Sequence, residues 1–270
     1  MSNEENKLLD DLGALISGLL EAYEDWRASI KSAPPSEKTV AATSCLFVAL
    51  KQADGIKILI EKNRLESAMI LLRPLIEIYV NCAYIFISED KSNMIRFMYS
   101  SDKDALDNTK KYKKFVNETY TKPKYTEAMF NVLIKKYEAS INEISELGYP
   151  LKKMPDFRSR CEMVQKYTGC PDFGELYFNS YLLLCDTTHV SASSIAEVSV
   201  SEDFKTRWHG RESLGRRKDT LSITNGIISS MVIFLEKNAN IKLKRNQYFK
   251  GEIIKKYNRY IEYDELKQTA

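Results

Sequence analysis

The chain has 270 residues, of which 44% are hydrophobic and 29% charged, and its formal net charge is +3. This composition is typical of a globular protein, and the charge is too small to argue for nucleic-acid binding by itself. Ten glycines and seven prolines are few for this length, which favours long helices over a many-stranded sheet.

The five cysteines form no CxxC pair and indicate reduced thiols in a cytoplasmic protein. The N-terminal stretch is acidic and lacks the basic-then-apolar order of a signal peptide. Residues 65–88 come nearest to a membrane span, but Arg73 and Glu77 would lie at mid-bilayer, where charges are costly. We therefore expect no membrane partner.

Apolar residues at helical spacing predict an all-α fold, an irregular bundle of seven to eight helices. Residues 1–240 are expected to form one domain and residues 241–270 a basic helical tail. Residues 195–215 are the least patterned and predict a short strand or an irregular loop. In chain order, the expected helices of the domain cover residues 6–30, 37–62, 65–88, 92–120, 123–147, 157–167, 173–188 and 217–237, and the helix of the tail covers 245–267.

Local signals refine this outline. Ser36 is predicted to cap the second helix, and Gly55 either weakens that helix or lets a neighbour approach it closely. The third helix is apolar nearly all round, so it is expected at the centre of the fold. Pro74 cannot donate a hydrogen bond to the Ile70 carbonyl, which predicts a kink in that helix. Gly148 is expected to end the helix before it.

Missing motifs exclude most metal, nucleotide and nucleophile sites. His189 and His209 are the only histidines, and neither belongs to an HExxH motif or a Cys/His cluster. Glycine-rich phosphate loops and a GxSxG elbow are also absent. Cys185 and His189 have the spacing of a dyad, but a buried structural cysteine beside an unrelated histidine is the simpler explanation. We expect no metal and no cofactor.

Arg73 and Glu77 lie one turn apart in the third helix, where a charged pair is unexpected. One interpretation is a buried structural ion pair that ties helices together. The other is a polar pocket at the Pro74 kink, in which Arg73 binds a phosphate or carboxylate and Glu77 orients it or acts as a base. A pocket there could also take a small molecule against aromatic residues such as Tyr79 or Tyr181.

His189 follows a predicted helix, and Asp186, three residues before it, can orient its imidazole. The histidine is either a helix-terminal residue bonded to backbone carbonyls or a general acid and base that faces Arg73 and Glu77.

A basic and aromatic cluster, Arg207, Trp208, His209 and Arg211, lies in the least patterned segment. The cluster either binds a phosphate backbone, with Trp208 stacking on a base, or forms a solvated loop whose tryptophan packs on the body. The interleaved basic residues and tyrosines of the tail indicate a packed surface helix or one that docks on a second subunit.

LLRPLIEIYVNCAYI, residues 71–85, is similar to the Arg…Glu helix of the bacterial DUF5677 family, a group of uncharacterised helical proteins. FRSRCEMVQKYTG, which contains Arg160, and LYFNSYLLLCDTTHVSAS, which contains Tyr181, are similar to its second block and lie within 157–194. The resemblance implies an all-α core over about residues 37–240, akin to the HEPN helical domains.

HEPN domains recur in bacterial defence and toxin systems, often as metal-independent ribonucleases. Their signature, an arginine followed by four to six residues and a histidine, is absent here, because neither 182–184 nor 202–204 contains an arginine. A ribonuclease site would therefore have to combine Arg73 with the remote His189.

Two functions remain open. The first is a metal-independent, RNA-acting effector or toxin of an anti-phage defence system, with Arg73, Glu77 and His189 as catalytic residues. The alternative is a non-catalytic helical module that forms a homodimer or binds a partner protein, with Arg73 and Glu77 as a structural pair. The residues expected to contribute to binding are Arg160, Tyr181, Asp186, Arg207, Trp208, His209 and Arg211.

Overall fold

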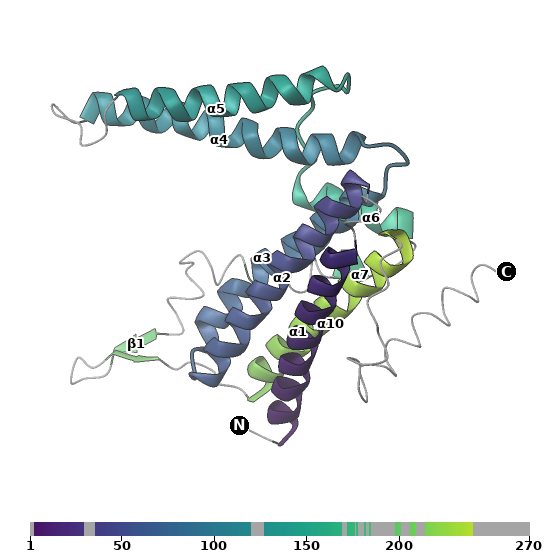
Figure 1. Ribbon diagram of the computed structural model, residues 1–270. Coiled ribbons are helices and arrows are strands. Elements are labelled where there is room, and N and C mark those ends of the chain that lie inside the picture. Colours follow the sequence, from purple (N-terminus) through teal and green to yellow (C-terminus); the bar gives the residue numbers. More distant parts are fainter. Residues whose placement is uncertain are drawn as a thin grey trace. The chain divides into compact units, whose positions relative to one another are not determined.

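A computed structural model describes most of the chain, and within the described residues the predicted all-α fold is confirmed (Figure 1). The described residues are 3–29, 36–119, 127–168, 172–175, 177, 181, 184, 198–200, 206–208 and 214–239. The helices are α1 (Asn3–Ser29), α2 (Glu37–Glu61), α3 (Leu65–Phe86), α4 (Ser92–Thr119), α5 (Glu127–Glu146), α6 (Phe157–Thr168), α7 (Asp172–Glu175) and α10 (Leu214–Ala239).

Most helices agree with their predicted ranges to within a few residues. The helix expected over 173–188 is described only in part, and the tail over 241–270 lies outside the described residues. Two short strands, β1 (Val198–Val200) and β2 (Thr206–Trp208), pair antiparallel. They occupy the segment for which the sequence predicted a short strand or an irregular loop.

The chain forms two compact units. The first contains Met1–Ala83 and Cys161–Ala270, and the second contains Tyr84–Arg160. The boundaries fall inside α3 and inside α6, so each of these helices contributes residues to both units. The expectation of one domain over 1–240 followed by a tail stays a prediction.

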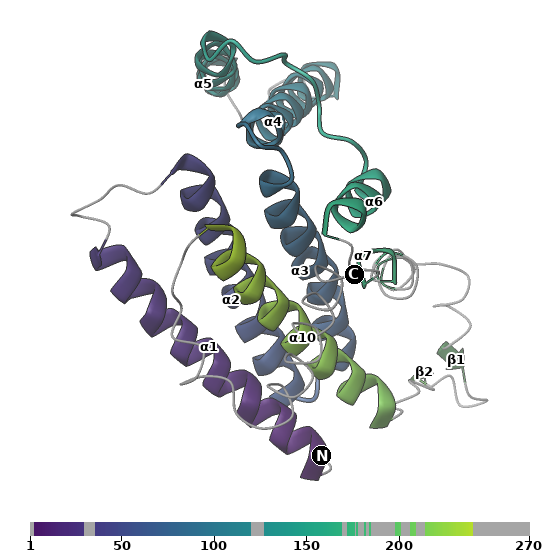
Figure 2. The same ribbon diagram turned by 90° about the vertical axis from the view of Figure 1, so that its right-hand side faces the viewer.

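In the first unit, α1, α2 and α10 pack against one another (Figures 1 and 2). Each helix buries the apolar face that its spacing predicts, because leucine and isoleucine side chains gain most by leaving water. A polar contact also joins two of them, since Asn225 donates its side-chain amide to the Leu8 carbonyl at 3.2 Å. Fully buried side chains from the three helices include Leu12, Leu19, Leu46, Ala49, Ala53, Leu221, Ile228 and Val232.

Signals in α2 and at its start are confirmed by the structure. Ser36 caps the helix, and its hydroxyl accepts a hydrogen bond from the Thr39 amide at 3.2 Å. A Cβ atom added at Gly55 would lie 3.1 Å from Leu71 Cδ1 of α3. The glycine therefore lets α3 approach α2 closely.

The third helix, α3, holds Pro74 inside its length and buries most of its apolar residues. Leu75 and Ile76 have no exposed surface. This burial agrees with the expected central helix, while the kink at Pro74 stays a prediction.

Among the described helices, α3 is the one that is long and apolar enough to cross a membrane. Half of its most apolar stretch, 50%, is buried inside the folded chain. A core helix also meets these criteria, so the expected absence of a membrane partner stays a prediction.

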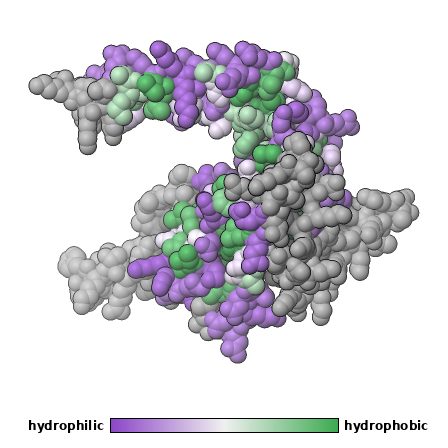
Figure 3. Space-filling view, viewed as in Figure 1, coloured by the Kyte–Doolittle hydropathy of each residue, from purple (hydrophilic) through white to green (hydrophobic). Residues whose placement is uncertain are grey.

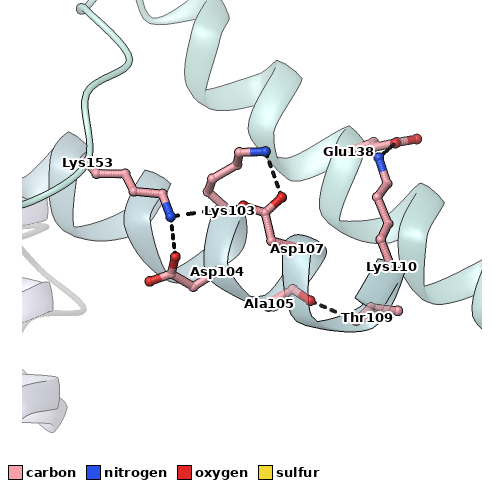
Figure 4. Close-up of polar contacts among 8 residues, drawn as sticks. All are labelled: Lys103, Asp104, Ala105, Asp107, Thr109, Lys110, Glu138 and Lys153. Atoms are coloured by element: carbon pink, nitrogen blue, oxygen red, sulfur yellow. Dashed lines mark hydrogen bonds and ion pairs between the residues drawn. The ribbon is translucent and has the colours of Figure 1, made fainter. Parts of the chain in front are cut away.

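In the second unit, α4 and α5 form an antiparallel hairpin. Figure 3 shows hydrophobic and hydrophilic residues side by side on the surface of this hairpin. One flank carries ion pairs between the helices, and Lys110 Nζ lies 2.8 Å from Glu138 Oε1. Figure 4 shows that pair and, further along α4, a second pair in which Nζ of Lys153, from the segment after α5, lies 2.5 Å from Asp104 Oδ1.

Gly148 follows α5 with a φ of +76°, and its amide donates to the Ser145 carbonyl at 3.2 Å. The predicted helix stop is therefore confirmed. Because an L side chain is strained at this φ, Gly148→Ala should lower the free energy of unfolding by about 1 kcal/mol.

Gly226 supplies a matched control, because it lies inside α10 without a positive φ and a Cβ added there meets no atom within 4 Å. Gly226→Ala should raise the free energy of unfolding by roughly 0.8–1 kcal/mol, since alanine favours the helix. Urea unfolding of both variants measures the two changes. If both variants change the free energy of unfolding by the same amount in the same direction, the role given to Gly148 is wrong.

Candidate functional site

The structure places Arg73 and Glu77 one turn apart on α3, as their spacing predicts. Arg73 Nε donates to Glu77 Oε1 at 3.3 Å. The Arg73 side chain is 24% exposed and that of Glu77 is 36% exposed. The pair is therefore neither sealed in the core nor fully solvated, and a solute can reach it.

Tyr181 closes a three-membered hydrogen-bond ring with this pair. Arg73 Nη2 donates to the Tyr181 hydroxyl at 3.2 Å, and that hydroxyl donates to Glu77 Oε1 at 2.8 Å. The guanidinium carbon also lies 5.1 Å from the centre of the Tyr181 ring, within the range of a cation–π contact. We call Arg73, Glu77 and Tyr181 the Arg73 cluster.

One aromatic ring stacks on the Arg73 cluster, and a separate aromatic pair joins α3 to α7. Tyr177 stacks on Tyr181, with ring centres 5.9 Å apart and planes inclined by 20°. Tyr79 of α3 packs on Phe173 of α7, with ring centres 5.0 Å apart. The cluster therefore combines a charged hydrogen-bond donor with flat apolar surfaces, of which Tyr177 keeps part of its side chain exposed.

The surroundings of Tyr181 disfavour its phenolate. Burial, followed by the hydrogen bond to Glu77 and the charge of that carboxylate, raises the pKa of Tyr181 from 10.0 to about 12. Arg73 opposes this rise but is outweighed. The tyrosine therefore remains a neutral hydrogen-bond donor over the physiological pH range, and cannot serve as a base there.

This shift has a consequence at alkaline pH. Because the pKa of Tyr181 is higher in the folded chain than its ordinary 10.0, the stability that it contributes is complete below pH 10 and disappears as the pH rises through about 12. The unfolding free energies of the wild type and Tyr181→Phe should therefore differ most below pH 10 and converge towards pH 12. Urea unfolding across this range measures the difference, and a difference that grows with pH would contradict the hydrogen-bond ring.

The contacts that the structure gives for Arg160, another predicted binding residue, are local. Its Nη1 atom lies 3.5 Å from Met154 Sδ, and its guanidinium carbon lies 5.4 Å from the centre of the Phe157 ring. The side chain is largely buried, at 9% exposure. A role for Arg160 in holding α6 against the preceding segment explains these contacts.

The other predicted site residues are not placed. His189, Asp186, His209 and Arg211 lie outside the described residues. For Arg207 and Trp208 the structure gives the backbone alone, in strand β2, where Trp208 is paired with Val198 and Arg207 with Ser199. Their assigned roles stay predictions.

Sequence reasoning missed two aromatic contacts, that of Tyr177 with Tyr181 and that of Phe173 with Tyr79. Tyr177 lies four residues before Tyr181, the spacing at which helical side chains share a face, so a stacked tyrosine pair could have been predicted. No comparable signal marks the contact between Phe173 and Tyr79, which depends on how α7 packs on α3. Within the part of the chain that the structure describes, no group of three His, Cys, Asp or Glu residues can hold a metal ion.

Comparison with known proteins assigns the chain to a family. The family model described as "Family of unknown function (DUF5677)" matches residues 39–206, which is more than half of the chain. No curated protein and no solved structure matches the chain. The chain therefore belongs to the DUF5677 family, and the matched range includes the whole Arg73 cluster.

Proposed function

We propose that this member of the DUF5677 family is a metal-independent, RNA-acting effector of a bacterial defence system, and that the Arg73 cluster binds the RNA backbone. The observation that carries the proposal is the geometry of Arg73. Its guanidinium is held by Glu77 and by the Tyr181 ring, and yet a quarter of the side chain, 24%, remains exposed. An arginine fixed in this way is suited to a phosphate group.

The aromatic rings favour RNA over a free phosphate. Tyr177 and Tyr181 offer flat surfaces beside the arginine, and unpaired bases stack on such side chains. Stacking is worth roughly 1–3 kcal/mol per base and tolerates any base. The cluster would therefore hold a single-stranded segment by its phosphate and an adjacent base.

The proposed reaction is a transesterification that needs no metal. A base removes the proton of the ribose 2′-hydroxyl, the 2′-oxygen forms a bond to phosphorus, and the bond from phosphorus to the 5′-oxygen breaks. The leaving 5′-oxygen takes up a proton, so the products are a 2′,3′-cyclic phosphate and a 5′-hydroxyl. Arg73 would stabilise the charge on the phosphoryl oxygens, and the Tyr181 hydroxyl, which donates its proton to Glu77, would hold the guanidinium in place.

The role of base falls to His189 in this proposal, because Glu77 is already engaged. The Glu77 carboxylate accepts hydrogen bonds from both Arg73 and Tyr181, and its Oε1 atom takes part in each. Because Glu77 accepts both hydrogen bonds, its carboxylate fixes the orientation of Arg73 and Tyr181. Histidine is the side chain whose ordinary pKa lies closest to neutrality, and of the two histidines His189 is the one within the residues 39–206 that the family model matches.

The hydrogen-bond ring also favours a second function. Arg73, Glu77 and Tyr181 form hydrogen bonds with one another although Glu77 and Tyr181 are 104 residues apart in the sequence. These bonds can hold α3 and a later segment together. If that structural role is the only role of the Arg73 cluster, the protein is a non-catalytic module that binds a partner protein or a second copy of itself.

A metal-free RNA assay separates the two functions. Wild-type protein incubated with single-stranded RNA and EDTA should generate 2′,3′-cyclic phosphate ends, and His189→Ala should generate none while it keeps the wild-type circular dichroism spectrum. RNA that stays intact with the wild type would overturn the RNA-acting function in favour of the module.

A further inference from the structure

Two cysteines that the proposed function does not use meet where α3 packs on α2. The thiol of Cys82, on α3, contacts the Ala42 carbonyl of α2, with 3.9 Å between sulfur and oxygen. Cys45 lies three residues after Ala42, on the same face of α2, and its thiol is hydrogen-bonded to the Cys82 thiol. We call Cys45 and Cys82 the thiol pair.

One antiparallel register of α2 and α3 accounts for the thiol pair. Gly55 lies opposite Leu71, where a Cβ added to the glycine would be 3.1 Å from Leu71 Cδ1. Cys45 lies ten residues before Gly55, and Cys82 lies eleven residues after Leu71. Both cysteines are therefore about 15 Å along their helices from that point, and so they face each other. A bond between two facing cysteines needs closely spaced backbones, and the missing side chain at Gly55 lets the two helices approach.

The two thiols differ in access and in acidity. Cys45 is partly exposed, whereas Cys82 has no exposed surface. The hydrogen bond from Cys82 lowers the pKa of the Cys45 thiol below its usual range and outweighs burial, which acts in the opposite direction. The same hydrogen bond, followed by burial and by the charge of Cys45, raises the pKa of Cys82 well above its usual range. Because the thiolate is the form that attacks an oxidant, Cys45 is the attacking sulfur and Cys82 lies behind it.

The thiol pair is suited to oxidation and not to a structural zinc ion. A zinc site needs three or four ligands, and no group of three His, Cys, Asp or Glu residues that could hold a metal occurs in the described part of the chain. A disulfide needs two sulfur atoms alone. In a reducing cytoplasm, such bonds are usually transient and respond to oxidants.

We propose that Cys45 and Cys82 are a redox modification site at which a hydroperoxide forms a reversible disulfide between α2 and α3. The Cys45 thiolate attacks a peroxide oxygen, the oxygen–oxygen bond breaks, and the departing oxygen takes up a proton as an alcohol or water. The Cys82 sulfur then attacks the sulfur of the Cys45 sulfenic acid, the sulfur–oxygen bond breaks, and the Cys82 proton leaves with the hydroxyl group as water. The thiols lose two electrons in all, which the peroxide accepts, and a dithiol reductant restores them by exchange.

Peptide mapping of the full chain identifies the bond. After treatment with equimolar hydrogen peroxide and alkylation of the remaining thiols, trypsin should release residues 39–51 and 65–91 joined to each other, at their summed mass less two hydrogen atoms. Each peptide contains one cysteine, and the second stays whole because Pro74 prevents cleavage after Arg73. A dithiol reductant should separate them. Peptides that remain unlinked, or Cys45 joined to a different cysteine, would overturn the proposal.

The bond should also raise the melting temperature. It closes the loop from Cys45 to Cys82 and so restricts the unfolded chain, which predicts a rise of roughly 5–15 °C on oxidation. Circular dichroism of the oxidised and reduced protein measures this rise.

Matched variants assign the rise to the thiol pair. Cys45→Ser should lose both the joined peptides and the rise. Cys161→Ala is the control, because Cys161 is another buried free cysteine, on α6, and this variant should keep both. An equal rise in Cys45→Ser would contradict the proposal. Neither measurement involves RNA, so its outcome is independent of the proposed function.

Discussion

Arg73→Ala should slow RNA cleavage about 100-fold or more. Removal of one preorganised donor from a charge-stabilising site typically costs roughly this much. Arg73→Lys should recover only part of the rate, because an ammonium group keeps the charge but lacks the planar fork that binds two phosphate oxygens. The rate is measured as the appearance of 2′,3′-cyclic phosphate ends in the presence of EDTA.

The matched control for Arg73 is Arg64→Ala. Arg64 lies just before α3, is exposed, and carries the same charge. Its removal should change the cleavage rate little, since an exposed charge acts on RNA only through the screened field of the whole protein. If both alanine variants slow cleavage equally, Arg73 contributes general charge alone, and the proposed binding role would be wrong.

Ile76→Ala should lower the free energy of unfolding by about 2–5 kcal/mol, the usual cost of a cavity in a packed core. Ile76 lies between Arg73 and Glu77 on α3 and has no exposed surface. The loss combines the transfer free energy of the missing methyl and methylene groups with the contacts that the cavity forfeits.

Ile70→Ala on the same helix provides the comparison, because Ile70 is 41% exposed. It should change the free energy of unfolding by roughly 0.5 kcal/mol or less, as surface substitutions usually do. Urea unfolding followed by circular dichroism measures both variants. Equal losses would show that α3 is not held in the core by the face that contains Ile76.

The helices could be predicted because their signals are local. Apolar spacing located α2 to within a residue at each end, and Ser36 and Gly148 marked a start and a stop through backbone geometry that needs no tertiary contact. Gly55 shows where local signals fail. From the sequence, Gly55 could either weaken α2 or let a neighbouring helix approach it closely. The position of Leu71 on α3 shows that the close approach is the reason.

The candidate site likewise contains a local contact that the sequence predicts and a packing contact that it does not. Arg73 and Glu77 could be paired from the sequence because residues four apart on a helix share a face. The closing contact from Tyr181 could not, because it joins positions 104 and 108 residues apart and depends on packing. The sequence offered Tyr181 as an aromatic pocket residue, whereas the structure makes it the hydrogen-bond partner of both charges.

The exposure of two apolar residues of α5 escaped prediction for a different reason. Apolar residues at helical spacing indicate a buried face, whichever neighbour buries it. Val132 and Leu133 fit that pattern, and yet they are 67% and 40% exposed. Sequence spacing gives the face of a helix that avoids water, but it does not say whether that face is covered within the same chain.

The affinity of the Arg73 cluster for RNA tests the central claim most directly. Fluorescence anisotropy of a labelled single-stranded RNA, bound by a cleavage-deficient His189→Ala protein, gives the dissociation constant without turnover. Adding Arg73→Ala should weaken binding about tenfold or more, because a hydrogen bond to a charged group is worth roughly 1.5–3 kcal/mol. Adding Arg64→Ala should leave the constant nearly unchanged. Equal affinities for all three proteins would contradict the account.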